Sequence, residues 1–361
     1  MKISRCDVWR VRIPLVKPFV IATATMNCYE GVLLRLKSSD GLEGWGESAP
    51  SPAVTGEWPR TVERELKAAS KKILTLDPLE TGASLEAASR WVRGPAAIAA
   101  LDIALHDLKC RHYSIPLARL LGGFRKAIET SVTISIRDEN ETQRQAEELV
   151  RKGFRILKVK IGTDPVADIA RLRRLRGCLG SRIRIRVDAN QGYSVSGALR
   201  VLRGIYGCDV EFCEQPVPKD DLRALARVRR SSPVPIMADE SVRSPSDLLE
   251  IIRLKAADMV NLKLMKSGGL RGAQQLARIA EAAGMPCQMG CMIETRIGIT
   301  AATHLALAEG NIRFADLDGH LELASDPSRG GVLTSGGENR VPDVPGLGIS
   351  VTPGALPGPR R

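Results

Sequence analysis

Five short segments in the middle of the chain end in residues that can carry a proton or bind a metal ion, and they recur at nearly even intervals. Their terminal residues are 24 to 28 positions apart, which is the length of one strand, one helix and two loops. Such a repeat predicts a parallel β/α barrel, in which the carboxyl ends of all strands open onto one face. We therefore expect the five terminal residues to meet at one barrel mouth. They are Lys160, Asp188, Glu214, Asp239 and Lys263.

The length and composition allow a barrel and one further domain. Of 361 residues, 43% are hydrophobic, enough for a barrel of about 200 to 250 residues and a second core. The eight cysteines form neither a CxxC pair nor a zinc-like cluster, so we expect reduced thiols. No uninterrupted apolar segment has the length of a signal peptide core or a membrane span. These features predict a cytoplasmic protein with no membrane partner.

The formal net charge of +12 raises the question of an acidic partner such as nucleic acid. The arginines at residues 171–176 and 223–230 alternate with Leu, Ala or Val, as expected for the solvated side of outer barrel helices. No nucleic-acid-binding motif or aromatic platform accompanies them. We therefore predict no nucleic-acid partner, and a polyanion binder remains a distant alternative.

The first part of the chain has the pattern of a small α+β domain, which we place over residues 1–124. Three stretches of strand-like polarity suggest an antiparallel meander, and two helical stretches follow, one opening with a proline. The strands are expected at 4–13, 29–36 and 41–47, and the helices at 61–74 and 95–109.

From residue 127 onward, strand and helix patterns alternate, which predicts a barrel over residues 125–325 and a C-terminal segment over 326–361. One more strand is expected at 331–334, followed by a loose terminus rich in Gly and Pro. Two of the intervening helices are expected at 141–152 and 269–283. The eight barrel strands are expected at 128–136, 156–161, 183–188, 210–214, 236–239, 259–263, 286–289 and 312–315.

Three of the segments end in a carboxylate, at Asp188, Glu214 and Asp239. Mg²⁺ prefers oxygen ligands and leaves positions for water or substrate oxygens. Three carboxylates within a few ångströms repel one another unless a cation lies between them. One such residue is more often a helix cap or a surface charge, but the shared position on three successive units favours a Mg²⁺ site.

Lys158 and Lys160 are two residues apart on one predicted strand, so both side chains point to the same face. A parallel barrel strand is covered on both faces, so these lysines are expected at the mouth. A nearby divalent cation lowers the pKa of an amine and makes it a usable base. Lys263 is expected across the barrel, and two bases on opposite faces of one carbon are what a racemase or epimerase needs. Lys266 is a weaker candidate, because a Ser-Gly-Gly turn follows it.

Asp316 and Asp318 follow the eighth predicted strand. Two carboxylates on alternate positions can bind a cationic group such as an ammonium. The alternative is a helix cap or a turn, which is the more ordinary interpretation of the residues alone.

With these segments the chain resembles the enolase superfamily, in its muconate lactonizing enzyme subgroup, over nearly its whole length. The resemblance implies a TIM-like (β/α)7β barrel closed by an α+β capping domain to which the C-terminal segment returns. It also implies that Mg²⁺ holds a substrate carboxylate while lysines move the α-proton, since a Lys base with Mg²⁺ is a known pattern of this superfamily. The motifs that carry the resemblance are KVK at 158–160, DANQGY at 188–193, EQPVP at 214–218, ADES at 238–241, NLKLMKSGG at 261–269 and GWGE at 44–47.

Within this subgroup, Asp316 and Asp318 look like the DxD motif of dipeptide epimerases, which holds the α-ammonium of the N-terminal residue. The Ala-Glu epimerases carry an arginine in a loop where residues 21–26 here read IATATM. A glutamate side chain would lack its partner, so the resemblance implies a small or apolar second residue. Met292 and Ile293 are compatible with contacts to it.

We therefore predict that the protein is an isomerase. The predicted activity is that of a Mg²⁺-dependent dipeptide epimerase, which transfers the α-proton of the C-terminal residue of an L,L-dipeptide. Lys160 and Lys263 would alternate as base and acid, and Lys158 would help to hold the enolate charge. The fold leaves open a muconate cycloisomerase, an o-succinylbenzoate synthase or an N-acylamino acid racemase. The expected partner is a small-molecule substrate, and we expect a homo-oligomer.

Overall fold

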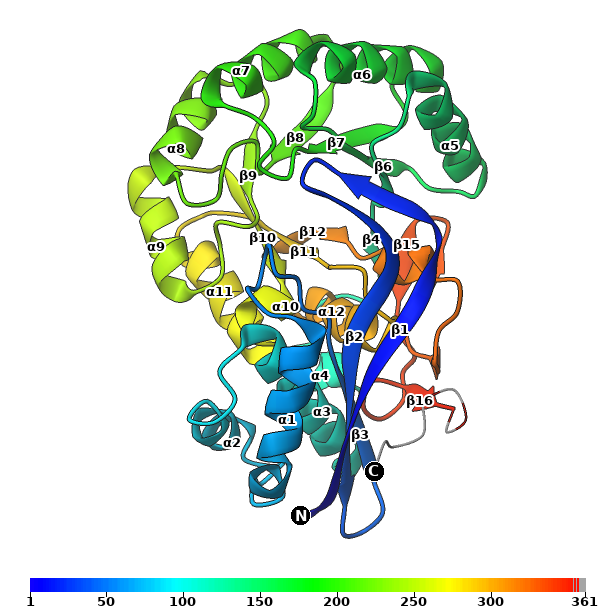
Figure 1. Cartoon of the computed structure of the whole chain (residues 1–361), viewed down its shortest axis with the longest axis vertical. Coiled ribbons are helices and arrows are strands. Elements are labelled where there is room, and N and C mark those ends of the chain that lie inside the picture. The colour runs from blue at the N-terminus through cyan, green and yellow to red at the C-terminus, as the bar shows by residue number, and fades with distance from the viewer. Residues whose placement is uncertain (353, 355, 357–361) are drawn as a thin grey trace.

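The computed structural model describes residues 1–352, 354 and 356, and it contains an antiparallel sheet with helices beside a parallel barrel (Figure 1). This architecture confirms the predicted barrel with an α+β capping domain. The expected loose terminus at 353–361 lies outside the described residues, apart from positions 354 and 356. No helix of the described chain is long and apolar enough to cross a membrane.

A long hairpin dominates the first domain. The predicted first strand is too short, because pairing resumes after an irregularity between Pro14 and Phe19. Prolines are tolerated there, since this is an edge strand. The hairpin therefore reaches the barrel, where the carbonyl of Val20 accepts a hydrogen bond from the Ile136 N–H. The sheet consists of β1 (Ile3–Ile21), β2 (Ala24–Ser38) and β3 (Glu43–Ser48), in that order.

Helix α3 packs so closely on β3 that only glycine fits between them. A Cβ atom added to Gly46 of the GWGE segment would lie 1.9 Å from the carbonyl oxygen of Ala100. The glycines of that segment therefore set the distance between helix and sheet. The helices of this domain are α1 (Pro59–Ile73), α2 (Thr81–Ala88), which was not predicted, α3 (Pro95–His112) and α4 (Leu117–Leu121).

Eight parallel strands form the barrel in chain order, and a bridge between Thr130 and Ala315 brings its two outer strands together. The prediction of one strand at 128–136 is wrong in its first part, because β4 (Ile128–Glu129) pairs with β15 (Glu338–Arg340) instead. The barrel strands are β5 (Val132–Ile134), β6 (Ile156–Lys160), β7 (Arg184–Asp188), β8 (Val210–Glu214), β9 (Ile236–Ala238), β10 (Met259–Lys263), β11 (Cys287–Gly290) and β12 (Ile312–Asp316).

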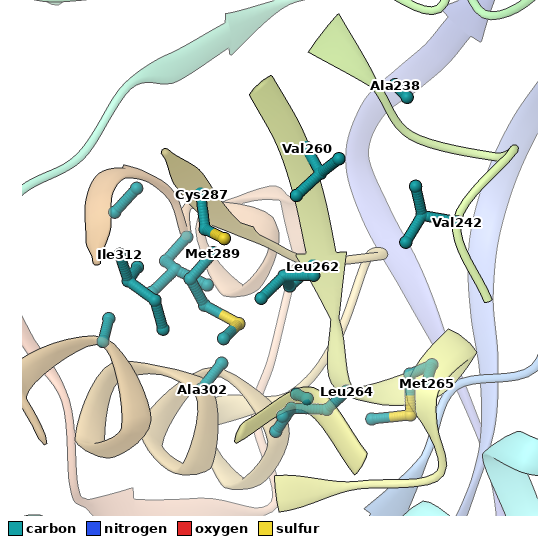
Figure 2. Close-up of a cluster of buried hydrophobic side chains, with 14 of the residues drawn as sticks. Ala238, Val242, Val260, Leu262, Leu264, Met265, Cys287, Met289, Ala302 and Ile312 are labelled. Carbon is teal, nitrogen blue, oxygen red and sulfur yellow. The ribbon is translucent and has the colours of Figure 1, made fainter. Parts of the chain in front are cut away.

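Helices connect successive strands and cover the outside of the barrel (Figure 1). Several begin after a side chain that accepts a hydrogen bond from the first turn, such as Asp138 before α5 and Ser244 before α9. Apolar side chains including Val260, Leu262 and Met289 pack between strands and helices (Figure 2). The helices are α5 (Glu139–Arg151), α6 (Pro165–Leu179), α7 (Val195–Gly204), α8 (Leu222–Ser231), α9 (Pro245–Leu254), α10 (Leu264–Ser267), α11 (Leu270–Ala282) and α12 (Arg296–Ala308).

Inside the barrel, a buried arginine lies in an apolar layer below the mouth. Successive side chains on a strand point to opposite faces, so this layer lies two residues before the mouth residues of the same strands. The guanidinium of Arg186 is 2.7 Å from Glu211 and 5.1 Å from the ring centre of Phe212. The apolar side chains of the layer are Phe212, Met237, Met259 and Phe314.

Replacing Arg186 by Ala is expected to lower the free energy of unfolding by about 3 kcal/mol, the low end for breaking a buried ion pair, because Glu211 is partly exposed. The matched control is Arg184→Ala on the same strand, because its exposed pair with Glu129 and its longer contact with Glu211, at 3.8 Å, contribute at most about 1 kcal/mol each. Urea unfolding measures both. Equal losses would contradict the buried role of Arg186.

The C-terminal segment packs against the first domain. Arg111 of α3 donates a hydrogen bond to the carbonyl of Ile349 at 2.7 Å, and the N–H of Leu347 donates to Asp107 at 2.8 Å. The strand expected at 331–334 is shifted. Short strands are found instead as β13 (Ser328–Gly330), which pairs with β16 (Ile349–Val351), and as β14 (Leu333–Ser335), which pairs with β15. The domain boundaries near residues 124 and 325 stay a prediction.

Two arginines of α6 that were expected on a solvated face are buried or partly buried instead. Arg171 is buried and lies 2.5 Å from Asp168. Arg176 donates hydrogen bonds to four backbone carbonyls, including those of Cys208 and Ile183. Each arginine thus joins its helix to loops of the barrel, because a guanidinium can donate several hydrogen bonds from one side chain.

Candidate active site

A cavity of about 190 Å³ opens at the barrel mouth, where the β1–β2 hairpin covers the strand ends. The hairpin contributes Phe19, Ile21 and Met26 to its wall. Residues of both domains therefore enclose one space. The predicted site residues that line it are Lys158, Lys160, Lys263, Met292, Ile293, Asp316 and Asp318.

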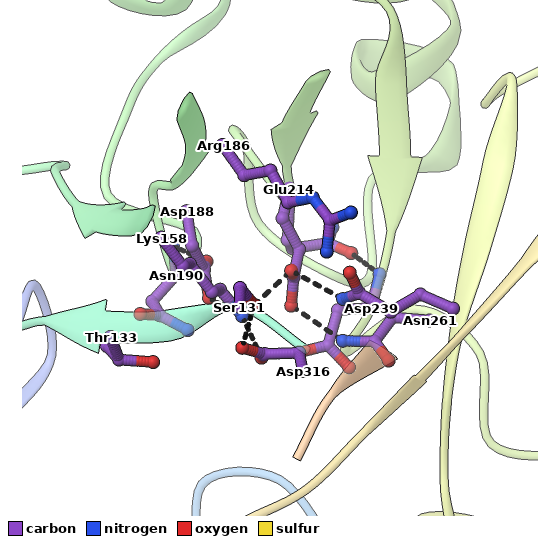
Figure 3. A network of polar contacts seen from close by, with 12 residues as sticks. Ser131, Thr133, Lys158, Arg186, Asp188, Asn190, Glu214, Asp239, Asn261 and Asp316 are labelled. Carbon is purple, nitrogen blue, oxygen red and sulfur yellow. Dashed lines mark hydrogen bonds and ion pairs between the residues drawn. The ribbon is translucent and has the colours of Figure 1, made fainter. Parts of the chain in front are cut away.

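Lys158 lines the cavity and belongs to a network of polar contacts with buried carboxylates (Figure 3). Its ammonium is 2.7 Å from Asp316, 2.9 Å from Glu214 and 3.0 Å from Asp188. Burial lowers the pKa of Lys158, but the three carboxylates outweigh this effect and raise it above its ordinary value. The lysine therefore supplies positive charge at the point where three strand ends meet.

Lys160 and Lys263 approach the cavity from strands that are four positions apart in the eight-stranded sheet. Lys160 Nζ is 2.7 Å from Asp188, and Lys263 Nζ is 2.7 Å from Asp239. Phe19 of the hairpin lies over Lys160, with its ring centre 6.0 Å from Nζ. Each lysine thus faces the cavity from its own side of the barrel, as two bases acting on opposite faces of one carbon require.

The three carboxylates predicted as metal ligands, Asp188, Glu214 and Asp239, are fully buried. Burial and the neighbouring Asp188 raise the pKa of Glu214 to about 8. Burial opposes the charge of Asp239, but Lys263 and Lys266 outweigh it and hold the pKa of that carboxyl below its usual range. The carboxylates therefore need nearby positive charge to stay ionised together.

The three carboxylates are chemically suitable ligands for a divalent cation, although the ammonium groups of lysines lie between them. No group of three acidic, imidazole or thiol side chains in the described chain is arranged to enclose a metal ion as it stands. Buried oxygens of Glu240 and Asn261 nevertheless accept no hydrogen bond. Unsatisfied buried oxygens are rare, and carboxylate and amide oxygens are ligands that Mg²⁺ accepts.

Lys266 is part of this network, and the prediction that it lies in a turn is wrong. The chain forms the short helix α10 directly after β10, which turns Lys266 back beneath the mouth. Its ammonium contacts the Asp239 carboxylate and lies 3.0 Å from the Asn261 carbonyl. The sequence feature that indicates this position is the spacing of three residues between Lys263 and Lys266, which is nearly one helical turn.

Asn261 was also not predicted as a site residue. Its side chain donates a hydrogen bond to Glu214 at 2.8 Å, and it lies two residues before Lys263 on the same strand face.

Asp316 and Asp318 both line the cavity but have different partners. Asp316 accepts hydrogen bonds from Lys158 and from the Ser131 hydroxyl, each at 2.7 Å. Asp318 accepts one from the Thr133 N–H at 2.6 Å. Burial and the neighbouring Asp316 raise the pKa of Asp318 to about 7. Asp318 thus has no cation within ion-pair distance among the described residues, and a bound ammonium would supply one.

Part of the cavity wall is apolar, and three further acidic residues also line it. Met292 and Ile293 line the cavity together with apolar side chains of the hairpin. The acids Glu30, Glu240 and Glu322 were not predicted. No arginine lines the cavity in the described part of the chain. Among the described lining residues, no arginine from another segment therefore replaces the one that residues 21–26 lack.

The loop that carries Met292 is fixed by a glutamate of the first domain. Glu47, the last residue of GWGE, accepts hydrogen bonds from the Tyr29 hydroxyl, the Thr295 hydroxyl and N–H, and the Gly298 N–H, between 2.5 and 2.8 Å. It therefore caps the start of α12 from the other domain. Burial raises the pKa of Glu47 to about 7, and burial together with Glu47 raises the pKa of Glu294 to about 8.

This pair predicts a pH dependence of stability. A carboxyl whose pKa is raised by folding stabilises the fold at pH values below its unfolded pKa of 4.5, and this contribution is lost as the pH rises through about 8. The free energy of unfolding of Glu294→Gln should therefore decline less than that of the wild type between about pH 5 and about pH 9. Urea unfolding at both values is the measurement. Glu281→Gln, an exposed change, should leave the decline unaltered.

Comparison with known proteins agrees with this architecture. Residues 5–122 match the N-terminal domain of the mandelate racemase / muconate lactonizing enzyme family, and residues 141–355 match the enolase C-terminal domain-like family. An L-Ala-D/L-Glu epimerase of Bacillus subtilis is 39% identical over 97% of each chain. An L-Lys-D/L-Arg epimerase of Methylococcus capsulatus is 41% identical over 97% of this chain and 99% of its own.

Among solved structures, a dipeptide epimerase of Enterococcus faecalis in complex with Mg and L-Leu-L-Tyr superposes with a TM-score of 0.94. It is 37% identical, over 97% of this chain and 100% of its own. These similarities confirm the predicted superfamily and the predicted class of isomerase, the racemases and epimerases. The chain therefore belongs to the mandelate racemase / muconate lactonizing enzyme family of the enolase superfamily.

Proposed function

We propose that this protein is a Mg²⁺-dependent dipeptide epimerase, which inverts the α-carbon of the C-terminal residue of an L,L-dipeptide. The observation that carries the proposal is the pair of lysines, Lys160 and Lys263, facing one cavity from opposite sides of the barrel. A one-base enzyme would need only one of them. Relatives named as dipeptide epimerases support the same reaction.

In the proposed reaction, the neutral lysine of the pair removes the α-proton, and the electron pair left behind moves into the substrate carboxylate. The other lysine of the pair, which is protonated from the start, then donates its proton to the opposite face of the carbon. Lys158 lies next to the carboxylates and would help to hold the enolate charge. Asp188, Glu214 and Asp239 would hold Mg²⁺, which when bound supplies positive charge that stabilises the enolate.

The second residue of the dipeptide is proposed to be small or apolar. The wall formed by Ile21, Met26, Met292 and Ile293 offers apolar contact, and no arginine is available to pair with a glutamate side chain within the described residues. The named relatives act on different dipeptides, so this choice depends on the cavity of this chain. A cytoplasmic location and a homo-oligomeric state stay predictions.

The test is proton exchange in D₂O. Incubated with Mg²⁺ in D₂O, an L,L-dipeptide with an apolar second residue should gain one α-deuterium and invert, without any other change in mass. A cycloisomerase or a dehydrating synthase would instead form a product whose covalent bonds differ from those of its substrate. If a broad dipeptide library shows no exchange with Mg²⁺ present, the proposal fails.

The ammonium site gives a further prediction. Asp318→Asn should lower kcat/KM for a free dipeptide roughly 10- to 100-fold, since a hydrogen bond to a charged group contributes about 1.5–3 kcal/mol. The variant should affect N-acetylated dipeptides far less, because they carry no ammonium. An equal loss for both substrates would contradict the proposed contact.

A further inference from the structure

The backbone of Lys160 is held by a buried arginine from the following helix. Arg171 of α6 donates a hydrogen bond to the carbonyl oxygen of Lys160 at 2.8 Å, and its other terminal nitrogen donates to the carbonyl of Arg137 at 2.9 Å. Only 5% of its surface is exposed. One guanidinium thus joins the end of β6 to the segment between β5 and α5.

Two further buried side chains complete this contact. Asp168 lies 2.5 Å from Arg171 through one oxygen, and its other oxygen accepts hydrogen bonds from the Tyr193 hydroxyl at 2.5 Å and the Gly162 N–H at 3.0 Å. Asp168 therefore neutralises the buried guanidinium and also fixes the backbone two residues after Lys160. A buried charge with so many partners has little freedom to move.

Lys263, the second lysine of the pair, is not held by the hydrogen bonds of Arg171, Asp168 and Tyr193. The described contacts of Arg171, Asp168 and Tyr193 all lead to the ends of β5, β6 and β8, and none of them reaches β10, which carries Lys263. Lys263 depends on Asp239 and on the α10 turn that follows it. The two sides of the cavity are therefore built separately.

We propose that Arg171, held by Asp168 and Tyr193, is a positioning residue for Lys160 and has no such part for Lys263. This inference depends on the proposed epimerase function. If the two lysines serve opposite faces of the α-carbon, loosening Lys160 slows proton transfer on one face only. A displacement of about 1 Å can cost roughly 100-fold in rate.

The experiment compares α-deuterium exchange of the L,L and L,D epimers as separate starting materials. Lys160→Gln first identifies the epimer whose proton Lys160 removes. Arg171→Lys should slow exchange of that same epimer about 10- to 100-fold and leave the other within about twofold. Tyr193→Phe, which keeps the shape and removes one hydroxyl, should give a smaller asymmetry in the same direction and serves if Arg171→Lys does not fold.

The matched control is Arg176→Lys on the same helix. Arg176 also donates to backbone carbonyls, but those precede β7 and β8, at the end of the strands away from the cavity. Its replacement should reduce stability and leave the ratio of the two exchange rates unchanged. Equal slowing of both epimers in Arg171→Lys, or no slowing, would overturn the inference, because a purely structural residue affects both lysines alike.

A second measurement keeps this inference separate from the proposed function. If the wild type exchanges no dipeptide, the proposed function fails, and a crystal structure of Arg171→Lys decides the positioning role. The expected result is that Lys160 Nζ leaves Asp188, 2.7 Å away in the wild type, while the 2.7 Å contact of Lys263 with Asp239 stays. Unchanged positions of both lysines would overturn the inference.

Discussion

Replacing Lys263 by Gln is expected to lower the rate of epimerisation by roughly 10²- to 10⁴-fold, the usual contribution of a general acid or base. Exchange of one epimer with D₂O should persist, because Lys160 can still remove and return a proton on its own face. Lys160→Gln should show the reverse pattern, with exchange of the other epimer. Measuring exchange and inversion together by mass and by chiral separation distinguishes the two variants.

The control for this pair is Lys71→Gln on α1, an exposed change far from the cavity that should leave both rates unaltered. If either lysine variant lost exchange of both epimers, a single base would serve both faces. If either kept full epimerisation, the residue would not act as a base. Both outcomes would require a different assignment of Lys160 and Lys263.

Replacing Asp239 by Asn is expected to reduce Mg²⁺-dependent exchange by roughly 100-fold or more, since metal stabilisation of developing charge contributes several kcal/mol. Binding of Mg²⁺ to the folded protein should also raise the Tm of the wild type, because a ligand of the native state stabilises it. The variant should lose most of this shift. Chelation with EDTA should abolish wild-type exchange, and added Mg²⁺ should restore it.

The matched control is Asp220→Asn, a substitution at an exposed position that should keep both the Mg²⁺-induced shift in Tm and the exchange rate. Measuring Tm as well as activity separates a lost metal site from a lost catalytic group. An unchanged shift in Asp239→Asn would remove this residue from the proposed ligand set.

The repeat length and the alternation of side chains were sufficient to predict the barrel. Strands β8 and β10 begin and end at the predicted residues, and most others differ by one or two positions. A barrel strand is covered on both faces, so a polar residue at its carboxyl end has few places to lie except the mouth. Lys160 and Asp188 are consequently neighbours in the register of β6 and β7.

Pairings between distant segments were not predicted, because they depend on where the chain returns. The split of residues 128–136 arises from pairing with β15, which lies about two hundred residues later. The arginines of α6 also follow the same sequence pattern, yet Arg171 is buried and Arg173 lies on the surface. Which guanidinium can donate hydrogen bonds to buried carbonyl groups depends on the loops that pack around the helix.

The sequence by itself determined the alternation of strands and helices and the residue types at the strand ends, since both follow from local periodicity and from the two faces of a strand. The tertiary structure decided which charges touch. It set Lys158 among three carboxylates, brought Lys266 beneath Asp239 and buried Arg171 behind Lys160. These contacts join residues on different strands and helices, and their energies depend on distance and burial, which no local pattern contains.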